Sequence, residues 1–226
     1  MKVLVIAAHP DDEVYGMGGT IAKLSAEANE VHVLIVTDGS TTQYKNSPKL
    51  NEIINKKKEE VKYANDVLGV TKVHFGELPD MRLDNTAHVE VNSVIENVIR
   101  EVKPEVVYTH FYGDVNLDHQ YVYKSTLVAI RPVPSQSVKE LYCYRVPSST
   151  EWAPQTVLDT FMPTVFVDIS EYCFKKHEAI KLYETEIRNY PHPRSVEYVE
   201  KIDCATGLKC GIGTAEEFML LRKIIL

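Results

Sequence analysis

Several features are scarce in this sequence, and each scarcity excludes a class of protein. The four cysteines form no C-x-x-C pair, so they encode neither a zinc knuckle nor a disulfide framework. No run of 18 or more apolar residues occurs, and we expect no membrane span. The apolar stretch at the amino end lacks the basic start and small-residue cleavage site of a secretory signal, which predicts a cytoplasmic location.

Positive charge is also in short supply. The formal net charge is −7, and the one compact basic run, Lys56 to Lys58, sits beside Glu59 and Glu60. Such a mixed run is typical of a solvated helix face, so we expect no nucleic-acid partner. The 226 residues, 44% of them apolar, suit one globular domain over residues 1–226.

Short apolar runs alternate with helical patterns along the first half of the chain. This alternation predicts an α/β fold, a Rossmann-like, doubly wound, mostly parallel sheet with helices on both faces. Beyond Arg131 the pattern loosens. The expected strands cover residues 3–8, 31–37, 72–75, 105–109, 140–145 and 164–167, and the expected helices 20–28, 51–68, 89–102, 119–130 and 170–188. The cluster Gly16, Gly18 and Gly19 falls between the first strand and helix and indicates a tight turn.

Two polar clusters follow strands of this expected sheet: H-P-D-D-E from His9 to Glu13, and D-V-N-L-D-H from Asp114 to His119. Ligands in open α/β sheets bind beyond the carboxyl ends of the strands, so the clusters can converge. Histidine and carboxylate ligands suit zinc, and three protein ligands leave a position open for water. Acids at a helix start also fit a simple capping role, which remains an alternative for the first cluster.

His9, Asp12 and His119 would supply the three ligands. Asp11 cannot point the same way as Asp12, so it is free to face the water and take its proton. Pro10 fixes the backbone between His9 and Asp11.

The motifs resemble a known family. A-H-P-D-D-E after an initial strand, with D-x-N-x-D-H about a hundred residues on, resembles the PIG-L/LmbE-like zinc-dependent de-N-acetylases, including the GlcNAc-phosphatidylinositol, mycothiol-pathway and bacillithiol-pathway enzymes. Further similar segments are G-M-G-G-T at 16–20, T-D-G at 37–39, the helix K-K-E-E-V-K-Y-A-N-D-V-L-G with Lys57 in place of the usual arginine, L-P-D at 78–80 and A-E-E-F at 215–218.

The resemblance implies one zinc ion per chain held by His9, Asp12 and His119, and another divalent metal is the alternative. It also implies Asp11 as general base and Asp118 as the supporting acid before the last ligand. It implies a Rossmann-like α/β domain and a small N-acetylated sugar as substrate. Members of the family are often oligomeric, which leaves a homo-oligomer open.

One position departs from the family pattern. Most members carry a histidine where this chain has Asn116, and that histidine is thought to stabilise the oxyanion or protonate the leaving amine. Asparagine can donate a hydrogen bond but cannot deliver a proton at neutral pH. The alternative donors are His110, His192 and the protonated Asp11 acting in reverse. N-x-D-H resembles a subgroup pattern that also shows S-S-T-E-W and Y-P-H-P-R-S, which occur here at 148–152 and 190–195.

Other residues are candidates for contacting the substrate. Arg82, Arg194 and Lys57 could meet a phosphate regardless of net charge, and Tyr112 and Trp152 could stack on a sugar ring. His110 and Arg194 complete the expected substrate contacts.

The resulting hypothesis is hydrolysis of an N-acetyl group on an amino sugar, giving acetate and a free amine. Two rivals stay open. One is a non-catalytic module that binds a nucleotide or sugar, and the other is a metal-dependent hydrolase of a different bond.

Overall fold

A seven-stranded sheet forms the centre of the computed structural model, which describes residues 1–157 and 159–225. The spatial order is β3-β2-β1-β4-β5-β7-β6, with β1 to β5 parallel and β7 antiparallel to both β5 and β6. The expected mostly parallel, doubly wound sheet is confirmed. The strands are β1 (Lys2–Ala7), β2 (Glu30–Thr37), β3 (Lys72–Leu78), β4 (Val106–His110), β5 (Glu140–Tyr144), β6 (Val165–Asp168) and β7 (Ala215–Lys223).

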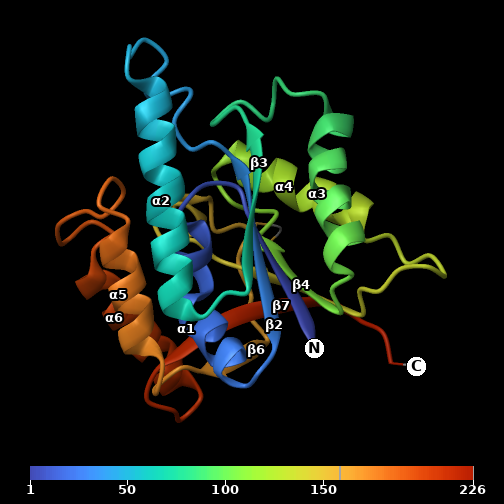
Figure 1. Cartoon of the computed structure of the whole chain (residues 1–226). Helices are drawn as coiled ribbons and strands as arrows, with labels where there is room; N and C mark the ends of the chain where they lie inside the picture. Colours follow the sequence, from blue (N-terminus) through green and yellow to red (C-terminus); the bar gives the residue numbers. More distant parts are fainter. Residues whose placement is uncertain (158, 226) are drawn as a thin grey trace.

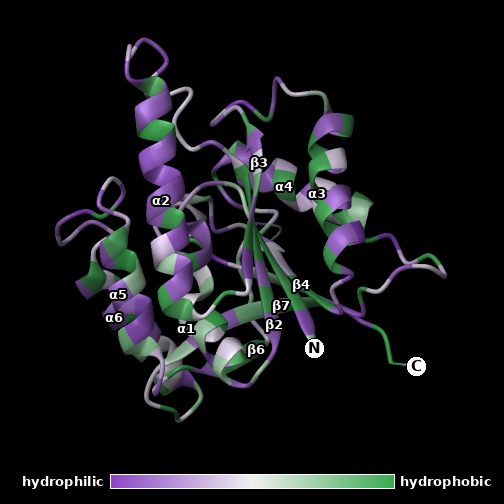
Figure 2. Cartoon of the chain, in the orientation of Figure 1, coloured by the Kyte–Doolittle hydropathy of each residue, from purple (hydrophilic) through white to green (hydrophobic). Residues whose placement is uncertain are grey.

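Helices cover both faces of this sheet (Figure 1). Val3 and Val5 of β1 point into one apolar core, and Leu4 and Ile6 point into the other. Because both faces are buried, the central strands are apolar nearly throughout, whereas the outer helices carry mixed hydrophilic and hydrophobic residues (Figure 2). The first face holds α1 (Asp12–Ala26), α2 (Leu50–Leu68), α5 (Cys173–Leu182) and α6 (Val196–Lys209), and the second holds α3 (His88–Val102) and α4 (Leu117–Ala129).

The first helix starts earlier than expected. It begins at Asp12 instead of residue 20 and runs through the glycine cluster, with a kink at Met17. The expectation of a tight turn there is wrong. A Cβ atom at Gly16 would overlap the ring of Tyr144 on β5, and one at Gly19 would lie 2.6 Å from Ile169 after β6. These glycines therefore serve close packing of α1 against the sheet.

The carboxyl-terminal part contains two elements that the pattern did not reveal, α6 and β7. The expected helix over 170–188 is shorter, since α5 ends at Leu182, and residues 183–195 instead lead to α6. Strand β7 begins with Ala-Glu-Glu-Phe, all four buried. Glu216 is tolerated there because it accepts hydrogen bonds from the backbone of Gly19 (3.0 Å) and Thr20 (2.7 Å).

Strands from both halves of the chain join the same sheet. The single domain expected over residues 1–226 stays a prediction. None of the described helices combines the length and apolar character needed to cross a membrane.

Candidate metal centre and active site

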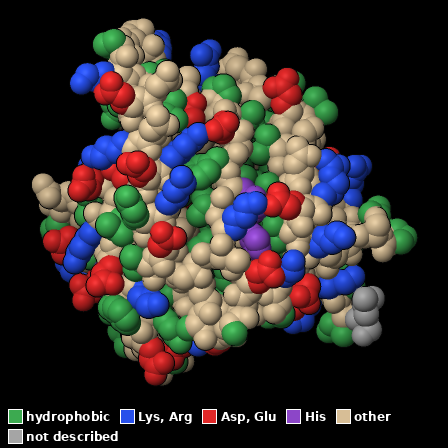
Figure 3. All heavy atoms as spheres, in the orientation of Figure 1, with side chains coloured by type: hydrophobic (Ala, Val, Ile, Leu, Met, Phe, Trp, Pro, Cys, Tyr) green, Lys and Arg blue, Asp and Glu red, His purple; other side chains and the backbone are tan. Residues whose placement is uncertain are grey.

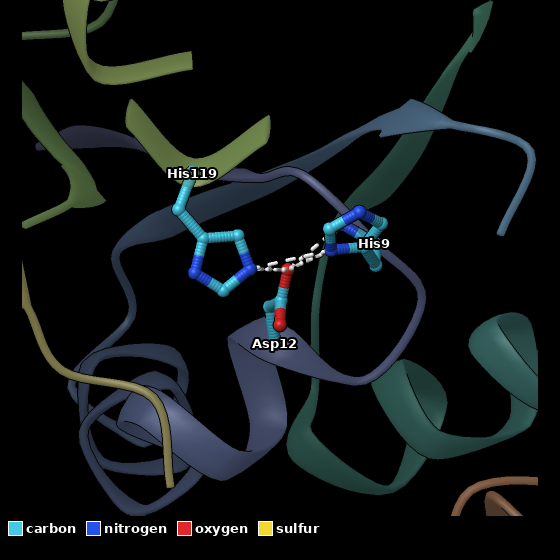
Figure 4. A group of neighbouring side chains, drawn as sticks. All are labelled: His9, Asp12 and His119. Carbon is cyan, nitrogen blue, oxygen red and sulfur yellow. Dashed lines mark hydrogen bonds and ion pairs between the residues drawn. The ribbon is translucent and has the colours of Figure 1, made fainter. Parts of the chain in front are cut away.

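Both polar clusters meet at the carboxyl edge of the sheet. His9 follows β1, Asp12 opens α1, and His119 lies in the first turn of α4, which follows β4. Because β1 and β4 are parallel neighbours, their ends bring these side chains together (Figure 4). His9 Nδ1 lies 3.2 Å from both His119 Nε2 and Asp12 Oδ2, and His119 Nε2 lies 3.3 Å from Asp12 Oδ2.

These three residues fit a divalent cation. One donor atom from each lies within 4.8 Å of the others, and Asp12 is fully buried. Its Oδ1 atom has no hydrogen-bond partner among the described residues, although a buried carboxylate oxygen normally has one. Two imidazoles and one carboxylate form a donor set that zinc favours and leave a coordination position open.

Each histidine is oriented by a second carboxylate. His9 Nε2 lies 3.1 Å from Asp118 Oδ2, and His119 Nδ1 lies 3.2 Å from Asp114 Oδ2. A proton on each of these nitrogens leaves His9 Nδ1 and His119 Nε2 free to bind a cation, as is usual for metal-bound histidines. Asp118 thus lies beside His9, and its expected supporting role stays a prediction. Sequence reasoning gave Asp114 no role, although it stands in the second cluster.

The electrostatics of the three candidate ligands support the same interpretation. Burial would lower the pKa of His119, but Asp12 and Asp114 outweigh it and raise the pKa to about 9. Burial would raise the pKa of Asp12, yet His119 and His9 hold it well below its usual value. The three residues thus keep the carboxylate of Asp12 ionised and favour a positive charge beside it. A metal ion bound to His119 Nε2 would replace the proton on that nitrogen.

Asp11 lies beside this centre in an unusual backbone conformation. It is the N-cap residue of α1 with φ 109°, a left-handed value that is uncommon outside glycine, and it is one of the residues that line the cavity described below. Neither carboxylate oxygen accepts a hydrogen bond from a described residue, and Arg194 Nη1 lies 3.2 Å from Oδ2. Burial raises the pKa of Asp11, and Arg194 opposes part of that increase. The position and the raised pKa suit a general base.

A cavity of about 290 Å³ opens over the centre. Figure 3 shows that acidic and basic side chains are interspersed over one face of the molecule. The cavity, called here the catalytic cavity, is lined by His9, Pro10, Asp11, Gly39, Thr42, Gln43, Lys57, Asp80, Met81, Asn116, Glu186 and Arg194.

A chain of ion pairs crosses one wall of the catalytic cavity. Lys57 Nζ lies 2.6 Å from Glu186 Oε1, and Glu186 Oε2 lies 2.9 Å from Arg194 Nη1. Arg194 Nε also donates to Ser148 Oγ at 3.0 Å. The expected solvated face is wrong for Lys57, which is only 3% exposed. The two cations share the carboxylate of Glu186, and Arg194 also lies beside Asp11. Their expected contact with a phosphate stays a prediction.

The chain also matches known proteins. The family model described as "PIG-L: GlcNAc-PI de-N-acetylase" matches residues 4–130, more than half of the chain. The chain belongs to the PIG-L family. Diacetylchitobiose deacetylase of Thermococcus kodakarensis is 30% identical over 190 residues, which cover 82% of this chain and 70% of the relative.

Two solved structures share the fold of this PIG-L protein. N,N'-diacetylchitobiose deacetylase of Pyrococcus horikoshii matches with a TM-score of 0.78 and 23% identity, covering 98% of this chain and 84% of that one. The 4-carboxy-2-hydroxymuconate hydratase of Pseudomonas putida KT2440 matches with a TM-score of 0.76 and 20% identity, covering 100% and 98%. The fold therefore hosts more than one reaction, and the chemistry has to be argued from the site.

Among the other candidates, Asn116 is placed in the catalytic cavity. Its Oδ1 caps α4 by accepting from the backbone of Asp118 at 2.9 Å. Its Nδ2 lies 3.6 Å from Met81 Sδ, a weak acceptor, which leaves this amide able to donate to a substrate oxygen.

Five other candidates do not line the catalytic cavity: Arg82, His110, Tyr112, Trp152 and His192. His110 is fully buried behind the metal centre; its Nε2 accepts from the backbone of Ala8 at 2.8 Å and its ring stacks on His119. We therefore assign His110 a supporting position instead of a substrate contact. Tyr112 packs on Phe111 and Tyr123. Trp152 is more than half exposed, and His192 Nδ1 accepts a hydrogen bond from the backbone N–H of Arg194 at 3.0 Å.

Sequence reasoning missed Asp80, the acid of the L-P-D segment. It lines the catalytic cavity, is only 6% exposed, and has His9 Nε2 as its nearest ionic partner at 3.6 Å. No described residue donates a hydrogen bond to its carboxylate, which leaves it available for a substrate hydroxyl. A signal existed, since L-P-D follows β3 at the same edge of the sheet.

Proposed function

We propose that this protein is a zinc-dependent hydrolase that removes an N-acetyl group from an amino sugar, giving acetate and a free amine. One observation carries the proposal: in a PIG-L chain, His9, Asp12 and His119 converge on a single point with the buried carboxylate of Asp11 beside it. The named relative with 30% identity is also a deacetylase.

The residues divide the work as follows. His9, Asp12 and His119 would hold a zinc ion, which would supply Lewis-acid chemistry for a carbonyl and make water easier to deprotonate. Asp11 takes the proton of the water that attacks the acetyl carbonyl. Asn116 Nδ2 donates a hydrogen bond to the oxygen that becomes negative during the attack.

The leaving amine still needs a proton, and Asp11 is the best placed donor. Of the three alternatives, His110 lies behind the metal centre and His192 does not line the catalytic cavity. Asp11 holds the proton taken from water, and its pKa is raised by burial, so the carboxyl group can pass that proton to the nitrogen. We propose that Asp11 serves first as base and then as acid.

The test measures bound metal by elemental analysis and acetate release from a panel of N-acetylated sugars. We expect one zinc per chain and acetate release from at least one sugar. Asp11→Asn should keep the zinc and lose at least about a hundredfold in kcat, since general acid-base catalysis contributes about 10²–10⁴. Asp66→Asn, a change of the same kind on the exposed face of α2, is the control.

Three results would count against the proposal. Retention of most activity in Asp11→Asn would remove Asp11 from both roles. Tight sugar binding without turnover across the panel would favour the non-catalytic module. Two metals per chain would favour the rival hydrolase of a different bond, because enzymes that cleave phosphate esters often use two metal ions.

A further inference from the structure

Asp11 is the N-cap residue of α1, yet its side chain does not cap the helix. An aspartate at this position usually accepts a hydrogen bond from the backbone N–H of the second or third residue of the helix. That bond is not made, and neither carboxylate oxygen of Asp11 has a hydrogen-bond partner among the described residues. The carboxylate is therefore left available for chemistry, and other contacts must hold the residue in place.

The backbone of Asp11 is held in a conformation that is unfavourable for an aspartate. Its φ of 109° is positive, and a strained conformation of this kind persists only where the surrounding structure fixes it. The carbonyl oxygen of Asp11 accepts hydrogen bonds from the backbone of Val14 and Tyr15, each at 3.0 Å, as part of the first turn of α1. The buried N–H on the other side of the residue needs an acceptor of its own.

The acceptor for the N–H of Asp11 is the side chain of Glu13, the second residue of α1. Its Oε2 atom lies 3.3 Å from the Asp11 nitrogen. The contact resembles one half of a capping box, in which a glutamate near the start of a helix reaches back to the N–H of the N-cap residue. The other half, a bond from the helix backbone to the N-cap side chain, is the one that is missing. Glu13 thus satisfies the backbone of Asp11 without engaging its carboxylate.

Glu13 is itself fixed by partners from two other segments. The residue is fully buried, and its Oε1 atom accepts a hydrogen bond from Asn65 Nδ2 on α2 at 2.8 Å and another from the hydroxyl group of Tyr183, which follows α5. Asn65 and Tyr183 are buried as well. A buried carboxylate with three donors from separate parts of the chain is restricted to one orientation, which makes it a rigid support for Asp11.

We propose that Glu13 is a positioning residue for the candidate base. By accepting the backbone N–H of Asp11, Glu13 holds Asp11 in its left-handed conformation and keeps the Asp11 carboxylate at the catalytic cavity instead of at the helix cap. Glu13 is not among the residues that line the cavity, so it acts through Asp11. The inference rests on the proposed deacetylase function for the role of Asp11, but the positioning itself can be tested without turnover.

The kinetic test uses Glu13→Met, because methionine has a similar length and suits a buried site but is only a weak acceptor. With the sugar that gives acetate in the panel, we expect kcat to fall at least about tenfold, since a displacement of about 1 Å can cost about a hundredfold. KM and the zinc Kd should stay within about twofold. Glu217→Met, which removes a buried, ion-paired glutamate from β7, is the control and should keep its kcat. An unchanged kcat in Glu13→Met would overturn the proposal.

A double-mutant cycle separates positioning from an independent role. Asp11→Asn lacks the carboxylate that Glu13 positions, so adding Glu13→Met to it should change the residual kcat by no more than about twofold. An equal fall in both backgrounds would show that Glu13 acts separately from Asp11, which overturns the proposal. If Glu13→Met does not fold, Glu13→Gln takes its place. Asn65 and Tyr183 hold the oxygen of this glutamine, so its amide opposes the N–H of Asp11 and the same fall in kcat is expected.

Crystal structures of the unchanged protein and of the folded Glu13 variant test the positioning directly. We expect Asp11 to leave the left-handed region in the variant and its carboxylate to accept a hydrogen bond from the backbone N–H of residue 13 or 14. An Asp11 that keeps a φ near 109° and an uncapped carboxylate would overturn the proposal, even in a protein that releases acetate. If the unchanged protein releases no acetate from any sugar, the deacetylase function fails, and the two structures still decide whether Glu13 positions Asp11.

Discussion

Replacing Asp118 by asparagine tests how the metal centre is held together. Asp118 is buried; its Oδ2 lies 3.1 Å from His9 Nε2, and its Oδ1 accepts a hydrogen bond from the backbone of Leu83 at 3.0 Å. Asparagine has nearly the same shape, but one of its two polar atoms is a donor. If its oxygen keeps the bond to Leu83, its amide faces the proton on His9 Nε2 and two donors oppose each other.

Two rearrangements would relieve this clash between donors, and each is unfavourable. Moving the proton of His9 to Nδ1 removes the nitrogen that binds the metal. Rotating the amide instead leaves the buried N–H of Leu83 without an acceptor, which costs about 1–3 kcal/mol. Loss of such a supporting carboxylate weakens metal binding about 10–100-fold, and this corresponds to about 1.4–2.7 kcal/mol.

The assay is a competition for zinc between the protein and a chromophoric chelator at neutral pH. We expect the zinc Kd of Asp118→Asn to rise about 10–100-fold, while circular dichroism stays as in the unchanged protein. Asp66→Asn on the exposed face of α2 controls for the loss of one negative charge. A Kd within twofold of that of the unchanged protein would refute the argument, because it would mean that Asp118 does not fix the orientation of His9.

Three further predictions follow from other parts of the molecule. Gly19→Ala should lower the free energy of unfolding by about 1–2 kcal/mol in a urea titration. Overpacking against Ile169 costs about 1–3 kcal/mol, which outweighs the gain of up to about 1 kcal/mol in helix propensity. An unchanged urea midpoint would contradict the packing role of Gly19. Arg194→Lys should lower kcat at least about tenfold with little change in zinc affinity, because one ammonium cannot replace the guanidinium contacts with Asp11, Glu186 and Ser148. Arg188→Lys, at a more exposed arginine, is the control. Equal kcat values for Arg194→Lys and the unchanged protein would refute the prediction. Burial raises the pKa of Asp203 to about 6 although Lys176 opposes it, so the folded protein binds this proton more tightly than the unfolded chain does. The resulting contribution to the free energy of unfolding is about 3 kcal/mol at most, is complete below about pH 4 and is lost as the pH rises to about 6. The free energy of unfolding should therefore decline from pH 4 to 7, and this decline should be absent in Asp203→Asn.

The prediction for Asp203 depends on an unequal sharing of one cation. Lys176 is buried between Asp203 (2.7 Å) and Glu216 (2.8 Å). Glu216 also accepts two backbone hydrogen bonds from Gly19 and Thr20, whereas the side chain of Asp203 has Lys176 as its one described hydrogen-bond donor. The less supported carboxylate is therefore the one that takes up a proton first.

The parallel half of the fold could be predicted because its signals are local. Strands β1, β2 and β4 are buried on both faces and are therefore apolar in sequence, and the helices between them carry a clear periodicity. Contacts between segments far apart in the sequence could not be predicted from such local signals. Gly16 and Gly19 of α1 are explained by Tyr144 and Ile169, both more than a hundred residues away. Strand β7 was hidden by its buried glutamates, and the partners of Glu216 lie on α1 and α5.

In the candidate site, too, the features with a local signal could be predicted and the long-range contacts could not. The convergence of His9, Asp12 and His119 could be predicted since each stands directly after a strand or at the first turn of a helix, and the carboxyl ends of parallel neighbours must meet. Whether a cation is free to bind substrate could not be predicted, because charge type does not reveal its partner. Arg194 matched the expectation of an anion-binding residue, yet the anions that it contacts, Asp11 and Glu186, belong to the protein. Arg194 lies in the segment 183–195 and contacts the candidate base Asp11, which is more than 180 residues earlier in the sequence. The local sequence around Arg194 does not indicate such a contact.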